Sequence, residues 1–323
     1  MENITSCSCD YHKDHKRLMD FWLDCRAASD VRKYPTIWRT RLLLSSRVWN
    51  QDKDSQIWET ESKQIIGFAM LWRRQAISPF VVLDCYLHPR LAANVLFTEI
   101  LQWGDNRANQ IAKEQEIGLT LYVTGAPQQD FSVNNLNKYG YAIVPPNLID
   151  FDVYFSKSLQ DKILLTPLPS GYKIRQLQNV DELQGYQALY GFAQVNPHHQ
   201  KELIESDEYS HFVVENPTRE FVAYCECSVC YDEWKRTNQK IGWIDYVETK
   251  SDEQKKGLGR TILIAGLLHL KKMGADTAML ITINSNSPAM SLYNKTGFSR
   301  VEIKDNPSYE KQILASNQSG HMA

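Results

Sequence analysis

The sequence predicts an α/β (α+β) protein with two domains in tandem. Its 323 residues are too many for one ordinary domain and suit two of about 150 residues each. The segment 156–171 contains two prolines and a glycine close together near the middle of the chain, and these residues interrupt helices and strands. We therefore expect domains over 1–158 and 172–315, joined by a linker over 159–171.

Both halves show the same order of predicted elements. Alternating apolar residues indicate strands, apolar positions three and four apart indicate helices, and glycines indicate helix ends. In the second half, strands are expected over 219–230, 241–249 and 277–283 and from 298 on. A polar hairpin loop is expected over 231–239, a helix over 257–273 and a short helix over 287–297. The first half repeats this outline with elements over 64–72, 80–87, 92–108, 119–124 and 134–140. Phe298 follows Tyr141 by 157 residues and Thr249 follows His88 by 161, which indicates an internal duplication.

The composition excludes several classes of protein. Hydrophobic residues make up 43% and charged residues 23%, as in ordinary globular proteins. The formal net charge of −2 argues against a dedicated nucleic-acid binder. No apolar stretch approaches the ~18 residues of a membrane span, the polar N-terminus does not resemble a signal peptide, and the seven irregularly spaced cysteines suggest no disulfide framework. We expect a cytoplasmic protein without nucleic-acid or membrane partners, and the composition leaves its oligomeric state open.

A loop between a predicted strand and a predicted helix carries the strongest chemical signal. It contains Gln254, Lys255, Lys256, Gly257 and Gly259, followed by Arg260. Glycines let the backbone approach a phosphate closely, and the N–H groups of a first helical turn point toward an anion bound there. The loop lacks the Gly-Lys-Ser/Thr ending of a P-loop and the third glycine of a dinucleotide fingerprint. A phosphate-binding loop is therefore predicted, and the alternative is that the glycines serve only as hinges.

Two motifs together resemble those of the GNAT superfamily of N-acetyltransferases. The loop is similar to the family's motif A, Gln/Arg-x-x-Gly-x-Gly/Ala, and the block from Asn286 to Phe298 is similar to Asn-x-x-Ala-x-x-Leu-Tyr-x-x-x-Gly-Phe. The blocks begin 32 residues apart, and the resemblance covers about 172–304. It implies a mixed, mostly antiparallel sheet with helices on both faces in each domain. It also implies acetyl-CoA, or a related acyl-CoA, as co-substrate, held where two central strands separate.

The resemblance also implies roles for individual residues. The pyrophosphate of the co-substrate would be bound by the loop residues Gln254, Lys255, Lys256, Gly257, Gly259 and Arg260. Thr249 would offer backbone contacts to the pantetheine or acyl group, and Asn286 would contact the coenzyme A arm. Tyr293 occupies the position of the family's general acid, which protonates the leaving thiolate. The alternative for Tyr293 is that it is only a packing aromatic on its helix.

The general base is less clearly marked. The family often places a Glu eleven residues before the Gln of motif A, but Trp243 stands there in this sequence. Asp245 lies two residues further on, so strand alternation puts it on the same face, whereas Glu248 is expected on the other face. Asp245 is the candidate base. The alternatives are that Asp245 is only a hydrogen-bonding residue at the rim, and that water or the solvent removes the proton.

The first half departs from the family pattern. His88, Pro89 and Arg90 are followed by no glycine pair, Leu136 stands where Tyr293 stands in the second half, and Gln129 stands for Asn286. We therefore expect a degenerate GNAT-like domain that binds no coenzyme A and helps to form the acceptor cleft.

Cysteines, histidines and aromatic residues provide weaker signals. The sequence Cys225-x-Cys227-x-x-Cys230 is expected to supply small core residues. The ligand types of Cys7, Cys9, His12 and His15 would suit zinc, but their spacing is cramped, so no metal is expected. Four aromatic residues could line an acceptor pocket or pack in the core: Tyr224, Trp234, Trp243 and Tyr246.

The expected function is that of an N-acetyltransferase. It would transfer acetyl from acetyl-CoA to a primary amine of a small-molecule or peptide acceptor by direct attack. The alternatives are a non-catalytic acyl-CoA sensor, and an enzyme of the same fold that uses a longer acyl-CoA or a hydroxyl acceptor.

Overall fold

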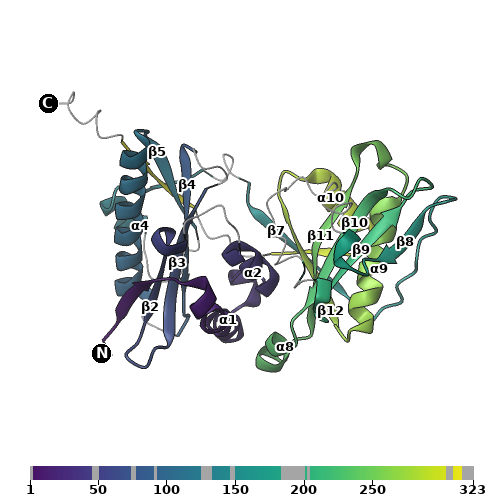
Figure 1. Ribbon diagram of the computed structural model, residues 1–323, viewed down its shortest axis with the longest axis horizontal. Helices are drawn as coiled ribbons and strands as arrows, with labels where there is room; N and C mark the ends of the chain where they lie inside the picture. The colour runs from purple at the N-terminus through teal and green to yellow at the C-terminus, as the bar shows by residue number, and fades with distance from the viewer. Residues whose placement is uncertain are drawn as a thin grey trace. The chain divides into compact units, whose positions relative to one another are not determined.

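The chain forms two compact units, each built on one seven-stranded mixed sheet (Figure 1). The computed structural model describes residues 3–45, 51–73, 78–90, 93–124, 133–145, 150–182, 201, 204–302 and 308–314. The first unit comprises Met1–Ile37, Ser46–Ile149 and Lys304–Ala323, and the second comprises Trp38–Ser45 and Asp150–Ile303. The predicted fold class is confirmed: strands and helices alternate in both units, and each sheet contains a single parallel pair among the strands described.

The first unit is organised around the long helix α4 (Ala93–Gln115). Its sheet runs in the order β1 (Thr5–Ser8), β2 (Ser55–Glu59), β3 (Ile65–Trp72), β4 (Phe80–Leu87), β5 (Leu119–Thr124), β14 (Tyr309–Ile313) and β6 (Ala142–Ile143). The remaining helical segments are α1 (Tyr11–Ala28), η1 (Val31–Lys33), α3 (Gln51–Asp54) and α5 (Val133–Lys138). Helix α4 extends beyond the predicted 92–108 because its buried side continues through Ala108, Ile111 and Ala112, which pack in the core with Leu121.

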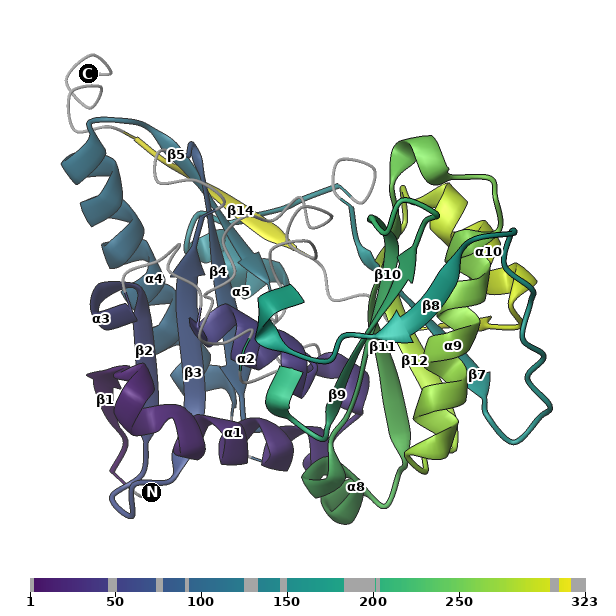
Figure 2. The same cartoon turned by 45° about the vertical axis from the view of Figure 1, so that its right-hand side comes forward.

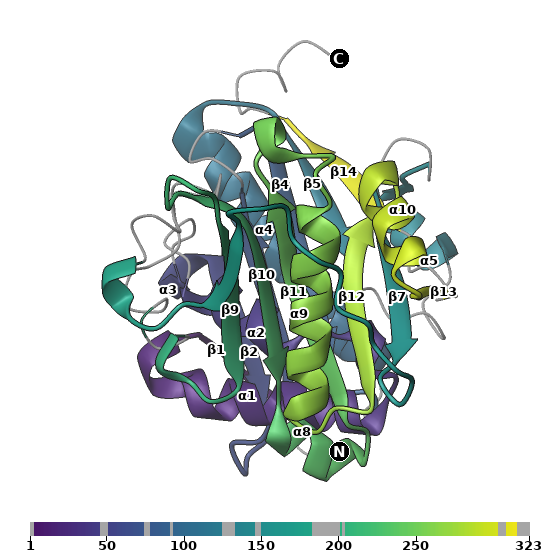
Figure 3. The ribbon, with the colours of Figure 1, turned by 90° about the vertical axis from the view of Figure 1, so that its right-hand side faces the viewer.

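The second unit is organised around helix α9 (Leu258–Lys272), which crosses one face of its sheet (Figure 3). The strand order is β13 (Ser299–Val301), β7 (Asp152–Ser158), β12 (Thr277–Ile283), β11 (Ile241–Thr249), β10 (Phe221–Val229), β9 (Tyr209–Glu215) and β8 (Lys173–Gln176). The other helical segments are α2 (Ile37–Ser45), η3 (Val180–Glu182), α8 (Tyr231–Thr237), η4 (Ser251–Glu253) and α10 (Ser287–Lys295). Gly266 permits the close packing of α9, because a Cβ there would lie 2.8 Å from the sulfur of Cys225. The prediction of a hairpin loop over 231–239 is wrong, since α8 occupies most of it and ends at Asn238 in the left-handed conformation.

Each sheet contains a strand that the sequence places with the other half. Strand β7 precedes the predicted linker, yet it lies between β12 and β13 in the second sheet and opposes β12 from Asp152–Ile283 to Ser158–Thr277 (Figure 3). Strand β14 comes at the far end of the chain, yet it lies between β5 and β6 in the first sheet. The two halves have therefore exchanged their last strands.

The exchange moves the division of the chain away from the expected limits. Near the middle of the chain the division falls at Ile149/Asp150, rather than at the expected limits of 158 and 172. The chain also passes from one unit to the other at Ile37/Trp38, Ser45/Ser46 and Ile303/Lys304. The segment 159–171 connects β7 to β8, two strands of the same sheet, and Leu159 is buried in its core. The prolines correctly indicate a break in regular structure, but they carry no information about which sheet the flanking strand joins.

Candidate active site

The loop before α9 has the backbone geometry of an anion site. Strand β11 ends at Thr249, the turn η4 follows, and α9 begins after Gly257. Gly257 has φ +83°, which favours glycine, and a Cβ there would meet nothing within 4 Å. The N–H of Thr261 donates to the carbonyl of Gly257 at 3.1 Å, so the N–H groups of 258–260 precede this hydrogen bond and remain available. The first turn of α9 therefore presents N–H donors beside open space.

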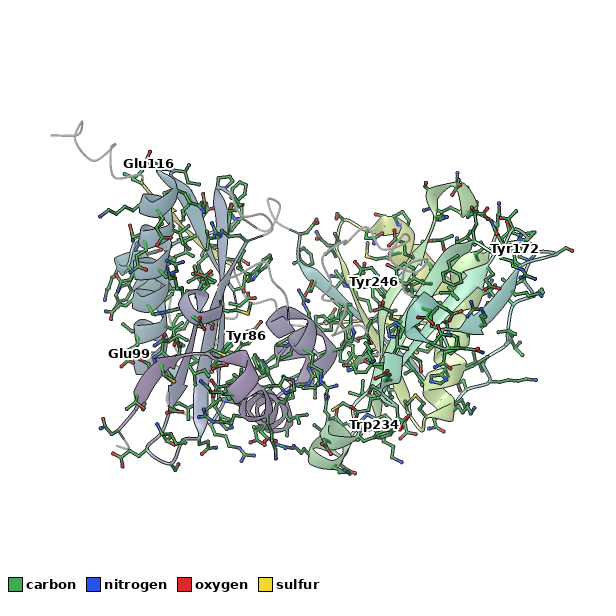
Figure 4. All side chains as sticks on the ribbon, in the orientation of Figure 1. Tyr86, Glu99, Glu116, Tyr172, Trp234 and Tyr246 are labelled. Carbon is green, nitrogen blue, oxygen red and sulfur yellow. The ribbon has the colours of Figure 1, made fainter. Side chains whose placement is uncertain are left out.

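Two side chains of the predicted phosphate loop stabilise the loop itself. The Lys256 ammonium donates to Glu253 Oε2 at 2.8 Å and to the hydroxyl of Tyr172 at 3.2 Å (Tyr172 is labelled in Figure 4). The side-chain amide of Gln254 donates to the carbonyl of Thr249 at 3.2 Å. Lys255 and Arg260 are exposed too, at the loop and in the first turn of α9, but unlike Lys256 and Gln254 they make no side-chain hydrogen bond to the described residues. The charges closest to a bound anion would then come from Lys255 and Arg260, while Lys256 and Gln254 hold the loop in shape.

The end of β11 lies directly against the start of α9. A Cβ at Gly259 would lie 3.2 Å from Thr249 Oγ1 and 3.8 Å from Leu292 Cδ2 of α10. The fold therefore brings Thr249, Gly259 and α10 together. Asn286 is the N-cap of α10, where its Oδ1 accepts the N–H of Ala289 at 3.2 Å, and the residue is exposed.

The parallel strands β11 and β12 separate part-way along their length. They pair at only four positions, from Ile241–Thr277 to Ile244–Leu280. Asp245 then forms a β-bulge, because Cys227 of β10 opposes Ile244 while Glu226 opposes Tyr246. Beyond the bulge, the last three residues of β12 pair with β7 and not with β11. A separation therefore opens between β11 and β12 on the way to the loop before α9.

The bulge also changes which side chains share a face. Beyond it, Tyr246 stacks on Tyr224 at 5.9 Å between ring centroids, and the Tyr224 hydroxyl donates to Glu248 at 3.0 Å (Tyr246 is labelled in Figure 4). Asp245 interacts with Ser228 and Glu226 on this same face. Helix α9 lies against the other face of the sheet (Figure 2). The expectation that Glu248 and Asp245 lie on different faces is therefore wrong, because strict alternation fails at the extra residue.

Tyr293 lies in an apolar environment in the middle of α10. It is 7% exposed, and its ring lies 5.6 Å from that of Phe155 and 6.1 Å from that of Phe298. Burial raises the pKa of its hydroxyl to about 12. The hydroxyl therefore stays protonated at neutral pH and can donate a proton or a hydrogen bond.

Asp245 is partly buried: its Oδ2 atom is shielded from solvent, and its carboxyl lies near two other polar side chains. Burial is the main reason why the pKa of Asp245 lies well above its ordinary value, and the charge of Glu226 raises it further. A hydrogen bond with Ser228 works in the opposite direction, and among the residues described Asp245 Oδ2 has no hydrogen-bond partner. A carboxyl of this kind is neutral over a wider pH range than an exposed one, and it is a stronger base once ionised.

Comparisons with known proteins agree with this geometry. The model of the acetyltransferase (GNAT) family matches residues 173–298. The uncharacterized N-acetyltransferase YvbK of Bacillus subtilis is 30% identical over 109 residues, which cover 30% of this chain and 70% of that protein. The chain belongs to the GNAT family of acetyltransferases.

Other relatives match shorter or more distant parts of this GNAT protein. The mycothiol acetyltransferase of Actinosynnema mirum is 39% identical over 66 residues, which cover 20% of this chain and 22% of that protein. This chain therefore spans only about a fifth of the length of such relatives. A GCN5-related N-acetyltransferase from Sphaerobacter thermophilus has a TM-score of 0.57 at 14% identity, with 96% of both chains covered. A tandem GNAT protein from the clavulanic acid biosynthesis pathway has a TM-score of 0.63 at 12% identity, covering 96% of this chain and 99% of that one. The tandem GNAT fold over both halves is thereby confirmed.

The two units of this GNAT protein differ at the corresponding parallel strands. In the first unit, β4 and β5 stay paired from Phe80–Thr120 to Asp84–Thr124, the last residue of β5. At that end the Asp84 carboxylate accepts hydrogen bonds from the Thr124 hydroxyl and from the indole N–H of Trp72, the latter at 2.8 Å. Asp84 thus links the two parallel strands at the last described residue of β5. The comparison of Gln129 with Asn286 lies outside the described residues, whereas Leu136 is buried in the first core.

The cysteines lie as predicted for core residues. Cys225 and Cys227 are buried beneath α9, and Cys230 is partly buried.

The described segments contain no group of three or more His, Cys, Asp or Glu side chains that could hold a metal ion. No helix of the described chain is both long enough and apolar enough to cross a membrane.

Proposed function

We propose that this protein is an N-acetyltransferase that uses acetyl-CoA and carries its active site in the second unit. The observation that supports this most directly is the anion site at Gly257 beside the separation of β11 and β12. A pyrophosphate would be bound by the N–H groups of the first turn of α9, with Lys255 and Arg260 adding positive charge. Lys256, Gln254 and Gly259 would shape this site, and Thr249 and Asn286 would contact the pantetheine and the coenzyme A arm.

The transfer would follow a direct attack. Acetyl-CoA supplies the activated acetyl group, and an unprotonated amine nitrogen attacks the thioester carbonyl. The C–N bond forms, the C–S bond breaks, the nitrogen loses a proton and the sulfur gains one. Tyr293 would give its proton to the leaving sulfur, which its raised pKa of about 12 permits because the donor form is then fully populated.

Asp245 is the proposed acceptor of the amine proton. It lies at the bulge where β11 and β12 separate, and its raised pKa makes its ionised form a stronger base than an ordinary carboxylate. The first unit is proposed to bind no acetyl-CoA, because its loop sequence lacks the glycine pair and Asp84 hydrogen-bonds Thr124 at the end of its parallel strands.

The proposal is tested by acetyl-CoA titration of Gly257→Val in a calorimeter. A β-branched residue at φ +83° is strained and would displace the first turn of α9, so we expect acetyl-CoA affinity to fall at least tenfold. Gly274→Val is the matched control, because Gly274 has φ +98° at the other end of α9 and a Cβ there lies 3.9 Å from the nearest atom, in Trp234. Equal affinities in both variants would contradict the proposed site. If acetyl-CoA binds but no free coenzyme A is released with any of the amines tested, the result would instead favour an acyl-CoA sensor.

A further inference from the structure

Helix α2 comes from the N-terminal half of the sequence but packs on the second sheet. Residues Trp38–Ser45 belong to the second unit. The Trp38 side chain, 7% exposed, lies in an apolar cluster with Tyr209 and Tyr246. The Arg41 guanidinium lies 5.9 Å from the centre of the Tyr209 ring. Tyr209 faces away from α9, because the next residue, Ser210, contacts His269 of α9 at 2.6 Å. Helix α2 therefore covers the same sheet face that carries Asp245.

Two N–H donors on one side of α2 have no acceptor among the described residues. Trp38 Nε1 and Arg41 Nε are buried and lack a hydrogen-bond partner among the described residues. Residues three apart lie on the same side of a helix, and both of these contact Tyr209. A buried donor left unsatisfied costs roughly 1–3 kcal/mol, and folded proteins contain few of them. A ligand that offers acceptor oxygens to both groups accounts for the pair, and it can reach Arg41 because this residue is partly exposed.

The charge at this position favours an anionic ligand. No carboxylate in the described part of the chain forms an ion pair with Arg41. Glu208, which lies near Tyr209, already accepts the N–H of Tyr231 at 2.9 Å. Asp245 is the other nearby acid, and its carboxyl interacts with Ser228 and Glu226. The positive charge of Arg41 is therefore available to an oxyanion.

The two donors lie close to the proposed reaction centre. Tyr209 opposes Ser228. Tyr246, which packs against the cluster of Trp38 and Tyr209, opposes Glu226 just beyond the bulge at Asp245. Ser228 and Glu226 are two residues apart along β10, so the two positions lie roughly 7 Å from each other. A compact acceptor could place an anionic group at α2 and its amine at the bulge.

We propose that Trp38 and Arg41 bind a carboxylate or phosphate group of the acceptor, so that the substrate is an amine carrying an oxyanion a few bonds away. This inference rests on the proposed acetyltransferase function and names its substrate class. Arg41 and Trp38 are then specificity-determining residues, and the N-terminal half of the chain supplies part of the acceptor site through α2.

The experiment compares matched amines with acetyl-CoA and measures the acetylated product by mass spectrometry. The first pair is 4-aminobutyrate and 4-aminobutyramide, and the second is 3-aminopropyl phosphate and 3-amino-1-propanol. We expect the wild-type protein to show a lower KM for the anionic member of at least one pair, and the preferred pair distinguishes carboxylate from phosphate. A preference for the neutral members of both pairs would overturn the inference.

Variants on α2 identify the residues responsible. Arg41→Met should raise KM for the anionic amine about tenfold or more, in line with a lost charge-assisted hydrogen bond, and leave KM for its neutral partner unchanged. Trp38→Phe keeps the ring and removes the N–H, so a smaller rise of roughly three- to tenfold is expected. Arg39→Met is the matched control, because it removes the same charge from the same helix, and Arg39 pairs with Asp152 at 3.2 Å. Equal changes for anionic and neutral amines in Arg41→Met would refute the assignment.

Direct binding separates this inference from the proposed function. Calorimetric titration with 4-aminobutyrate and with 3-aminopropyl phosphate, in the presence of coenzyme A, should show binding of at least one of them that Arg41→Met weakens. Absence of binding of both overturns the inference. If acetyl-CoA itself does not bind, the proposed function fails. If acetyl-CoA binds and only neutral amines are acetylated, the function stands and the inference about α2 is wrong.

Discussion

Replacing Phe155 by Ala on β7 tests whether this strand stabilises the second unit. Phe155 precedes the linker expected from the sequence, but it lies in the second core at 2% exposure. It opposes Leu280 of β12 and Arg300 of β13, and its ring contacts that of Tyr293. The substitution therefore removes a large buried side chain from the sheet that carries the proposed site.

The size of the effect follows from this burial. Truncation of a fully buried Phe to Ala lowers the free energy of unfolding by about 3–5 kcal/mol. Backbone amides of the second unit that exchange only when the unit opens should therefore exchange roughly 10²- to 10⁴-fold faster. Amides of β3 and β4 in the first unit should keep their rates if the two units open independently.

Hydrogen exchange followed by mass spectrometry measures both units in one sample. Peptides covering β12 should lose protection in Phe155→Ala, whereas peptides covering β3 and β4 should not. Tyr309→Ala on β14 is the reciprocal variant, since Tyr309 is buried in the first core and opposes Val123. This variant should speed the hydrogen exchange of peptides covering β5 and leave that of peptides covering β12 unchanged. Faster exchange in the first unit alone for Phe155→Ala would refute the exchange of strands.

Three further predictions concern the proposed site. Tyr293→Phe keeps the ring, so acetyl-CoA affinity should persist while the single-turnover rate falls about 10²-fold or more with an acetylated amine; a rate near that of the wild type would make Tyr293 a packing residue only. Saturation binding should give one acetyl-CoA per chain, and a ratio of two would show that the first unit also binds it. Because the pKa of Asp245 is higher in the folded than in the unfolded chain, its contribution to stability is complete below about pH 4 and is lost as pH rises through the folded pKa. Urea unfolding over a pH series should therefore show that the free energy of unfolding declines less toward neutral pH in Asp245→Asn than in the wild type. The same dependence of this free energy on pH in both proteins would contradict the prediction.

The sequence predicts the loop before α9 and the start of this helix well, and the pairing of strands poorly. The motif from Gln254 to Gly259 indicates the loop and the start of α9, because glycine at Gly257 and a following apolar helix have direct sequence signatures. The bulge at Asp245 leaves no such signature, so strict alternation misplaces Glu248. Long-range pairing is decided by burial in the complete sheet, which no local pattern records.

The same limit applies to α2 and to β7. Neither is among the elements predicted from the sequence, and their local sequences contain no information about which unit they join. The Lys256–Glu253–Tyr172 contacts were also missed, because Tyr172 lies 84 residues before Lys256 and joins it only in the fold. The roles of the site residues stay predictions, since they depend on molecules that bind to the chain.

The exchanged strands impose an order on synthesis at the ribosome. When β12 is made, β7 already exists, so the second sheet can close around it as soon as its own residues emerge. The first sheet must wait, because Tyr309 of β14 follows Thr124 of β5 by 185 residues. At typical translation rates this delay is roughly 10–40 s, during which β5 presents an unpaired edge to other nascent chains. The unit without the proposed site is thus the later one to mature and the one more in need of chaperone protection.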